Sequence, residues 1–243
     1  MTVLRPRIFP KNEVLAALSV RDGSLPEDPF GMNLSFNVGD NPETVRRNRA
    51  SFFGGLGINE DELAIPRQVH GTTIRRIDRP GSYPDTDGLI TASTGIFLCV
   101  TFADCVPILL FDPEKKCIGA VHAGWRGAAG EIVALGIRAL AQDFDTKPRD
   151  VLAYVGPAAG ACCYEIGDEV ARRFDERFVH RDSRTTVDLK GVLVDQLLSE
   201  GCERGNIEAS SACTIHELQY HSYRRDGPKS GRMMACIALL RAE

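Results

Sequence analysis

The sequence has no long hydrophobic run and no excess of positive charge, and each absence excludes a class of protein. No apolar stretch approaches the roughly 20 residues that a membrane-spanning helix needs. The short apolar patch at residues 14–20 lacks the cleavage site of a signal peptide. The formal net charge of −4 provides no basic field for nucleic acid or an anionic membrane. We therefore expect a cytoplasmic protein without nucleic-acid or membrane partners.

The chain is also poor in the residues that build large copper sites or structural zinc sites. It has five histidines and no His-x-His pair, whereas multicopper oxidases need many histidines in addition to a His₂Cys blue-copper site. None of the eight cysteines forms a Cys-x-x-Cys pair, so a four-ligand structural zinc site is not expected. Without a secretory signal, the cysteines are expected to be reduced thiols.

The length and composition are sufficient for one large domain. The chain has 243 residues, of which 43% are hydrophobic, and this is enough to bury a full core. There is no internal repeat, low-complexity segment or linker, so we predict a single domain over residues 1–243. Strand-like and helix-like patterns alternate between glycine and proline turns, which indicates a mixed α/β fold.

Apolar strands are predicted in the middle of the chain. Residues 95–104 are apolar on both faces, as in a buried strand. Residues 107–111 and 117–122 flank a polar turn, which predicts a hairpin beside that strand in the same sheet. The remaining predicted elements are strands at 151–155 and 233–240, a helix beginning at the Asn41-Pro42 cap, and helices at 127–142, 167–178 and 189–201.

Two histidines and one cysteine occupy matching places at the ends of apolar segments. His70 lies in QVHG, Cys105 in ADCVP and His122 in VHAGWRG, and loops at strand ends often carry functional side chains. If the strands pair as predicted, Cys105 and His122 lie at the same end of the sheet. Two imidazoles and a thiolate suit Zn²⁺, and three protein ligands leave a fourth position for water or substrate. The ligand spacing matches no short metal motif, so hydrogen-bonded histidines and a packing cysteine stay an open alternative.

Several segments, taken together, resemble one protein family. They are QVHG at 68–71, DGLIT at 87–91, ADCVPILLFD at 103–112, HAGWRG at 122–127, GPAAGACCYEIG at 156–167, SYRRDG at 222–227 and GR at 231–232. In this order, over nearly the whole chain, they are similar to the YfiH family, which is also called the laccase-domain or polyphenol oxidase family. Its members include purine nucleoside phosphorylases and the peptidoglycan editing factor.

The resemblance implies a fold, a ligand set and an activity. The family fold is a four-layer α/β/β/α sandwich, usually monomeric, and its zinc ligands fall here on His70, Cys105 and His122. The implied reactions are phosphorolysis of adenosine, inosine and methylthioadenosine, and deamination of adenosine. The expected partners are therefore a nucleoside and phosphate, and the chemistry needs an anion site and a metal-activated water.

Four further residues are candidates for substrate binding or catalysis. Arg49 shares a face of the first predicted helix with Arg46 and is the first choice for phosphate. Arg126, beside the amides that open the helix after HAGWRG, could equally receive the anion, and Asn33 could bond a ribose or phosphate oxygen. Asp104 precedes the ligand cysteine and could transfer a proton or orient a ligand histidine. Strand alternation argues for caution, because neighbouring residues point to opposite faces.

The same residues also allow other functions. In a metal-free cysteine hydrolase, Cys105 would be the nucleophile and His122 its base. A non-catalytic cell-wall editing factor would hold zinc without turning over nucleosides. A copper polyphenol oxidase is least favoured because histidine is scarce. His221 stands where the family commonly has an aromatic residue, and a pH-sensitive fourth ligand at this position stays open.

Overall fold

Two mixed β-sheets lie at the centre of the computed structural model, which describes residues 2–21 and 30–241. Within these ranges, the strand order is β1-β2-β14-β7-β3-β5 in the first sheet and β13-β10-β8-β9-β6-β4 in the second. The first sheet contains β1 (Val3–Leu4), β2 (Val14–Ser19), β3 (Leu63–Arg67), β5 (Gly81–Pro84), β7 (Phe97–Phe102) and β14 (Met233–Leu239). The second contains β4 (Ile74–Arg76), β6 (Gly88–Thr91), β8 (Val106–Asp112), β9 (Cys117–Ala123), β10 (Leu152–Val155) and β13 (Ile207–Ala209). A separate antiparallel pair is formed by β11 (Val179–Arg181) and β12 (Thr185–Val187).

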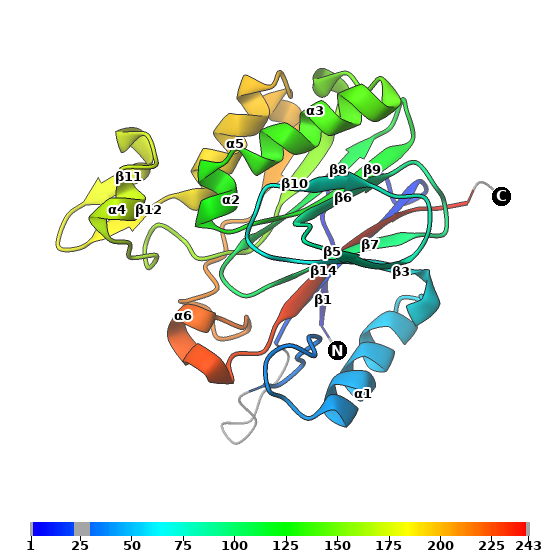
Figure 1. Cartoon of the computed structure of the whole chain (residues 1–243), viewed down its shortest axis with the longest axis horizontal. Coiled ribbons are helices and arrows are strands. Elements are labelled where there is room, and N and C mark those ends of the chain that lie inside the picture. Colours follow the sequence, from blue (N-terminus) through cyan, green and yellow to red (C-terminus); the bar gives the residue numbers. More distant parts are fainter. Residues whose placement is uncertain (1, 22–29, 242–243) are drawn as a thin grey trace.

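Helices cover the outer faces of the two stacked sheets (Figure 1). The first sheet is covered by α1 (Pro42–Gly54), and the second by α2 (Trp125–Ala129), α3 (Ile132–Phe144) and α5 (Leu189–Ser199). The short helices α4 (Asp168–Ala171) and α6 (Tyr223–Asp226) lie toward one end of the sheets, with α4 beside the β11–β12 pair. No helix within the described ranges has the length and apolar character needed to cross a bilayer.

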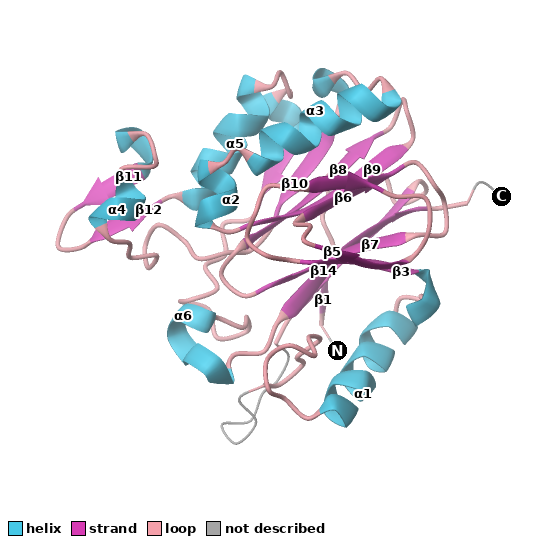
Figure 2. Ribbon diagram, viewed as in Figure 1, coloured by secondary structure: helices cyan, strands magenta, loops and turns pink. Residues whose placement is uncertain are grey.

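Three buried clusters fill the spaces between these layers, and Figure 2 shows helix, sheet, sheet and helix in that order. Alternation along β7 illustrates the division: Leu98 and Val100 join the cluster between the sheets, whereas Phe97 and Cys99 join the cluster that contains Phe53 of α1. The third cluster packs α3 and α5 against the second sheet. The predicted four-layer α/β/β/α sandwich is thus confirmed.

The first helix starts where its sequence predicts. The side chain of Asn41 accepts a hydrogen bond from the peptide N–H of Glu43 at 2.9 Å, and Pro42 occupies the first helical position, where its missing N–H costs nothing. Phe52 and Phe53 are fully buried against the first sheet, with their ring centroids 5.2 Å apart. The β8–β9 hairpin and the elements near 151–155, 189–201 and 233–240 are also confirmed.

The strand predicted at residues 95–104 lies in a different sheet from the β8–β9 hairpin. The pattern placed residues 95–104 beside the hairpin, but β7 pairs with β14 and β3 in the first sheet, and the hairpin lies in the second. The chain crosses between the sheets at residues 103–105. Both sheets are covered on both faces, so every strand involved is apolar throughout, and the pattern cannot distinguish one sheet from the other.

Two predicted helices are shorter or broken. The helix expected at 127–142 is divided into α2 and α3 at Glu131, whose left-handed backbone (φ 59°) interrupts the helical path. The helix expected at 167–178 consists of α4 alone. It is followed by a separate 3₁₀ turn, in which Asp175 accepts a hydrogen bond from the N–H of Arg177 at 3.0 Å.

Candidate metal centre

Three chain segments converge at one end of the two sheets. His70 follows β3 of the first sheet, Cys105 lies in the crossing between β7 and β8, and His122 is near the end of β9. In the β8–β9 hairpin, Val106 lies opposite Ala123 and the next pair along contains His122, so Cys105 sits beside the histidine. The expected proximity therefore arises from the hairpin register and not from a shared sheet with β7.

The side chains of these three residues form a group that can hold a metal ion. One ligand atom from each of His70, Cys105 and His122 lies within 4.8 Å of the others. The two imidazole rings meet edge to face, with centroids 4.9 Å apart. His122 is buried, Cys105 is half-buried and His70 is exposed, so the group opens to solvent on one side. Two imidazoles and a thiolate are a donor set that suits zinc and leaves a coordination position free.

Gly124 makes room for this convergence. A Cβ atom at this position would lie 3.1 Å from the Cys105 sulfur and 3.1 Å from the His70 ring. Both distances are shorter than ordinary van der Waals contact, so with any larger residue here the two ligands would have to shift by a few tenths of an ångström. Gly124, the first glycine of HAGWRG, is therefore required because the two ligands approach its backbone closely, and not because the chain turns here.

Asp87 organises the centre, and the sequence analysis named it only as the first residue of the DGLIT segment and gave it no role. It is fully buried, and one carboxylate oxygen lies 2.9 Å from Nδ1 of His122. The carboxylate also accepts peptide N–H bonds from Val69, His70 and Gly71 at 3.2, 2.9 and 2.8 Å. With Nδ1 engaged in this way, Nε2 of His122 is left for the metal, which is the usual role of a carboxylate behind a ligand histidine.

The signal in the sequence that could have identified Asp87 is its place directly before a fully buried strand.

Burial raises the pKa of Asp87, but the hydrogen bonds from His122 and from the peptide groups outweigh this effect and hold the pKa below its ordinary value. An ionised carboxylate at this depth needs such partners. It receives them because β6 and β9 are neighbours and the His122 N–H donates to the Asp87 carbonyl at 2.8 Å.

The loop that carries His70 is fixed from both sheets. His70 itself has a left-handed backbone (φ 59°), and successive amides around such a residue form a concave cradle for an anion, here the Asp87 carboxylate. On the other side, the Gln68 amide donates to the carbonyl of Thr101 at 2.8 Å and accepts from its N–H at 2.8 Å. His70 is exposed yet held in place by these contacts.

In the metal-free protein, Cys105 and His122 each shift the pKa of the other. Burial alone would raise the pKa of the Cys105 thiol, but the positive charge of His122 and hydrogen bonds from both histidines lower it to about 6. Burial would lower the pKa of His122, but the Cys105 thiolate and Asp87 raise it to about 9. The pair is therefore a thiolate and an imidazolium at neutral pH, with the ligand sulfur already deprotonated.

Asp104 connects the centre to two surrounding loops. Its carboxylate accepts hydrogen bonds from the Thr214 hydroxyl and from the N–H of Arg224, both at 2.7 Å. Its carbonyl accepts from the N–H of Ala159 at 2.9 Å. Both carboxylate oxygens are thus in use, which favours a positioning role for Asp104 over proton transfer.

Arginines and aromatic rings surround a cavity next to the centre. The cavity has a volume of about 370 Å³ and is lined by Trp125, Tyr164, Glu165, Ile166, Gly167, Glu169, Val170 and Arg224. Burial and the Cys105 charge raise the pKa of Tyr164 to about 12, and Arg126 and Arg224 are near enough to oppose this. Arg126 stacks on Trp125 at 4.3 Å and Arg224 on Tyr164 at 5.2 Å. Of these groups, the sequence analysis selected Arg126 for the anion, and Arg224 belongs to the SYRRDG segment that carries the family resemblance.

Arg232 is a further cation near the centre that was not selected from the sequence. It is half-buried, and burial lowers its pKa against the opposing effects of Cys105 and Asp104. Its peptide N–H donates to the Asn33 side chain at 2.9 Å. Its guanidinium lies over the ring of Tyr223 at 5.4 Å. The carbonyls of the preceding two residues fix the guanidinium further.

Two predicted substrate residues have other partners. Asn33 is fully buried, and its amide bonds Ser35, Asp40 and the N–H of Arg232, so it supports the loop that holds that arginine. Arg49 is buried in the α1 layer, stacks on Phe36 and Phe53 and pairs with Glu60 at 3.4 Å. None of its described contacts involves the metal-binding group.

His221 also lies apart from the three ligands. It is fully buried, and burial together with the charge of Arg21 lowers its pKa to about 3. Its ring packs against Gly231, where a Cβ atom would come within 2.7 Å of it. The structure does not bring the imidazole into the group of ligand atoms around Cys105.

Comparisons with known proteins identify the family of this chain. A family model described as multi-copper polyphenol oxidoreductase laccase matches residues 15–240. The crystal structure of the YfiH protein of Bacillus licheniformis superimposes with a TM-score of 0.88 at 31% identity, and the match covers 94% of this chain and 93% of that one. The chain belongs to the YfiH family.

Several curated relatives of this YfiH-family chain are named purine nucleoside phosphorylases. A purine nucleoside phosphorylase of Deinococcus radiodurans is 38% identical over 96% of this chain and 92% of its own length. A purine nucleoside phosphorylase of Corynebacterium glutamicum is 34% identical over 98% of both chains. The similarity thus extends over nearly the full length of each protein and includes all three segments of the metal-binding group.

Proposed function

We propose that this chain is a zinc-dependent purine nucleoside phosphorylase that acts on adenosine, inosine and methylthioadenosine. The observation that carries the proposal is the convergence of His70, Cys105 and His122 in a chain similar to purine nucleoside phosphorylases. Zinc is favoured over copper because the group offers two imidazoles and one thiolate, and the other three histidines lie outside it. Deamination of adenosine is proposed as a second activity of the same centre.

The cavity beside the centre suits a nucleoside in size and lining. Its volume of about 370 Å³ lies within the range of roughly 300–1,000 Å³ that is typical of small-molecule sites. Trp125 and Tyr164 offer aromatic faces on which a purine base can stack. We propose that the base lies against these rings, with the ribose directed toward the metal centre.

The cationic groups near the cavity suit phosphate. Arg224 lines the cavity and Arg126 lies beside it, while Arg232 lies within electrostatic reach of Cys105. Arginine binds phosphate oxygens through paired, charge-assisted hydrogen bonds. In this proposal, these side chains hold phosphate against the ribose, a role that the sequence analysis gave to Arg49, Asn33 and Arg126.

The reaction requires one bond to form and one to break. A phosphate oxygen bonds to the anomeric carbon, the C–N glycosidic bond breaks, and its electron pair leaves with the purine. The purine takes up the proton that hydrogen phosphate gives up when it becomes the sugar phosphate. The arginines orient the phosphate, the aromatic rings hold the base, and Asp104 keeps the loops that carry Arg224 and Thr214 in position. A bound zinc ion would supply Lewis-acid polarisation of the group at its open position.

The experiment is a product analysis. Zinc-loaded protein is incubated with adenosine or inosine, with and without phosphate, and the bases and nucleosides are separated by chromatography. We expect adenine or hypoxanthine to form only when phosphate is present, and inosine to form from adenosine without it. If neither nucleoside is consumed, the proposal is wrong, and a zinc-binding cell-wall editing factor becomes the better interpretation.

One observation favours a second candidate function. The lowered pKa of Cys105, caused mainly by His122 against the opposing effect of burial, is also what a metal-free cysteine hydrolase needs. The two proposals differ in how they respond to metal. Removal of metal with a chelator abolishes the phosphorylase and leaves the hydrolase active, whereas added zinc inhibits the hydrolase because it occupies the nucleophile.

We also propose that the protein is a monomer, as the family resemblance implies. Light scattering at micromolar concentration, with and without metal, tests this directly. A mass close to the 26.6 kDa of the chain is the expected result, and a mass of twice this value contradicts it.

A further inference from the structure

A second group of sulfur ligands lies outside the centre described above. Cys162, Cys163 and Cys213 each offer one sulfur, and the three sulfurs lie within 4.8 Å of one another. The Cys162 and Cys163 sulfurs are 3.2 Å apart. None of the three takes part in the proposed reaction, and all eight cysteines of the chain are free thiols.

The chain builds this group from two segments that are far apart in sequence. Cys162 and Cys163 follow the turn at Gly160, and Cys213 is brought to the same place by a parallel bridge with Ala158. The N–H of Gly160 donates to the Cys213 sulfur at 3.3 Å, and the N–H of Thr214 donates to the Ala158 carbonyl at 3.0 Å. The three sulfurs are thus held together by backbone pairing and not by chance proximity of flexible side chains.

The environment of Cys213 favours the anionic form that binds metals. The residue is buried, which by itself raises its pKa, but peptide N–H groups of Gly160, His216 and Ile215 point at the sulfur and lower the pKa below its ordinary value. Burial and the neighbouring thiols raise the pKa of Cys162 to about 12, so metal binding has to displace its proton. Lys190 adds a nearby positive charge that is felt by both sulfurs. Its ammonium group is fixed by hydrogen bonds to the carbonyls of Ser210 and Ala212 at 2.7 and 2.8 Å.

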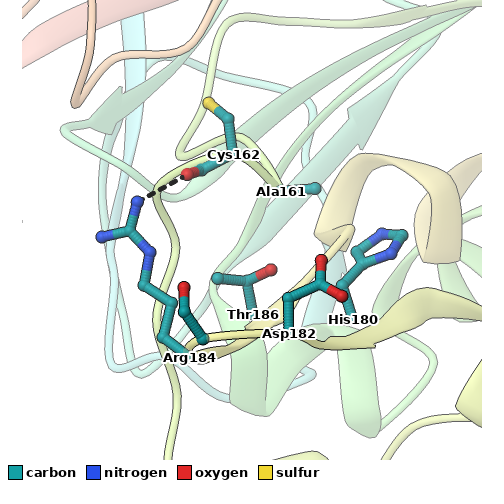
Figure 3. A pocket seen from close by; sticks show the side chains of 7 residues that line it. Ala161, Cys162, His180, Asp182, Arg184 and Thr186 are labelled. Carbon is teal, nitrogen blue, oxygen red and sulfur yellow. Dashed lines mark hydrogen bonds between the residues drawn. The ribbon is translucent and has the colours of Figure 1, made fainter.

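Access from solvent is provided by Cys162. Cys213 is buried, Cys163 is half-buried and Cys162 is exposed. Cys162 lines a pocket of about 320 Å³ together with His180 and Asp182, and its carbonyl accepts a hydrogen bond from Arg184 at 3.1 Å. Figure 3 shows that the Cys162 sulfur points away from the side chains of His180 and Asp182. Because Cys162 is exposed, a cation can reach its sulfur from solvent without any opening of the fold.

We propose that Cys162, Cys163 and Cys213 form a second metal site, selective for a thiophilic d¹⁰ cation, Cu⁺ or Zn²⁺. Soft thiolate ligands select these ions over Mg²⁺, Ca²⁺ or Mn²⁺. Binding replaces the protons of the three thiols by one cation, and the charge of Lys190 offsets part of the remaining negative charge. Three sulfurs complete the coordination of Cu⁺, whereas Zn²⁺ would take a fourth ligand, such as water, on the exposed side.

Such an ion would link two segments that meet the first centre. Tyr164 follows Cys163 directly and lines the cavity beside the first centre. Thr214 follows Cys213 and donates its hydroxyl to Asp104 at 2.7 Å. An ion in the second site would therefore hold together two segments that border the first metal centre. Its binding is expected to make these segments more rigid without contributing a ligand to the first centre.

The test is a metal titration of the fully reduced full-length protein, with Zn²⁺ in one arm and Cu⁺ in the other. After removal of unbound metal, we expect two equivalents per chain with at least one of the two ions. The variant His122→Ala should keep the second equivalent, and the arm in which it appears identifies the cation. A single equivalent in both arms, lost in His122→Ala, overturns the proposal.

Cysteine variants locate the second equivalent. Cys213→Ser and, separately, the exposed Cys162→Ser should each lose it and keep the first. Cys202→Ser is the matched control, because Cys202 is also a free thiol in the core but is not part of the group, and it should keep both equivalents. Because Cys162 is exposed, its replacement tests the site even if Cys213→Ser fails to fold. A second equivalent that persists in Cys162→Ser contradicts the proposal.

Discussion

Replacement of the buried Asp87 by asparagine should weaken metal binding although it spares the three ligands. The carboxylate meets four donors: Nδ1 of His122 and the peptide groups of Val69, His70 and Gly71. An asparagine keeps one acceptor oxygen and presents an NH₂ group in place of the other. Two donors therefore lose their acceptor and face another donor.

The expected magnitudes follow from these contacts. Loss of the partner behind a ligand histidine typically costs about 10–100-fold in metal affinity. When the asparagine oxygen stays with Val69 and Gly71, the two donors left without an acceptor are Nδ1 of His122 and the peptide N–H of His70. At about 1 kcal/mol or more each, they lower the free energy of unfolding by about 2 kcal/mol. Metal affinity is measured by competition with a chromophoric chelator, and stability by denaturant unfolding of the metal-free protein.

Asp112→Asn is the matched control for this prediction. Asp112 is also fully buried, and its carboxylate accepts two peptide N–H bonds, at 2.8 and 3.0 Å, in the β8–β9 turn at the far end of the hairpin from His122. Both bonds go to the same oxygen, and the other oxygen has no hydrogen-bond partner within the described residues, so an asparagine keeps both bonds and should leave stability and metal affinity nearly unchanged. Wild-type metal affinity in Asp87→Asn, or an equal loss in Asp112→Asn, would refute the reasoning.

Three further predictions address the centre and its rim. The rate of Cys105 alkylation in the metal-free protein should follow the thiolate fraction and rise through a pH of about 6. In His122→Ala this rise should move to higher pH, because the positive charge that lowers the pKa of Cys105 is removed. An unmoved profile would show that His122 does not lower that pKa. Gly124→Ala places a Cβ atom 3.1 Å from two ligands and should reduce metal occupancy measured by elemental analysis, whereas full occupancy would show that the ligands adapt. Arg232→Met should lower kcat/KM for phosphate by about 10–100-fold, from the loss of charge-assisted hydrogen bonds worth about 1.5–3 kcal/mol, and an unchanged value in steady-state assays removes this arginine from the anion site.

The sequence was sufficient for much of the fold because local signals agreed with the final structure. The Asn41 cap, the polar turn of the β8–β9 hairpin and the apolar strand before Cys105 each have one local interpretation, and all three are confirmed. The assignment of strands to sheets was not predictable. Both sheets are buried on both faces, so β7 and β8 carry the same apolar pattern although they belong to different layers.

The site was predicted in part, for a related reason. His70, Cys105 and His122 stand out as rare residue types at strand ends, and the structure brings them together. Asp87 was not selected, because an aspartate before a glycine is typical of an ordinary turn, and only the pairing of β6 with β9 places it behind His122. Arg232 depends on a contact with Asn33 almost 200 residues earlier in the chain, which no local pattern can reveal.

The central claim is that His70, Cys105 and His122 bind one zinc ion. Anomalous diffraction at the zinc edge, on crystals of protein that has been shown to cleave nucleosides, tests it most directly. The account predicts a peak about 2.0–2.1 Å from one nitrogen of each histidine and about 2.3 Å from the Cys105 sulfur. Active, zinc-loaded crystals with no peak within bonding distance of all three side chains would contradict it.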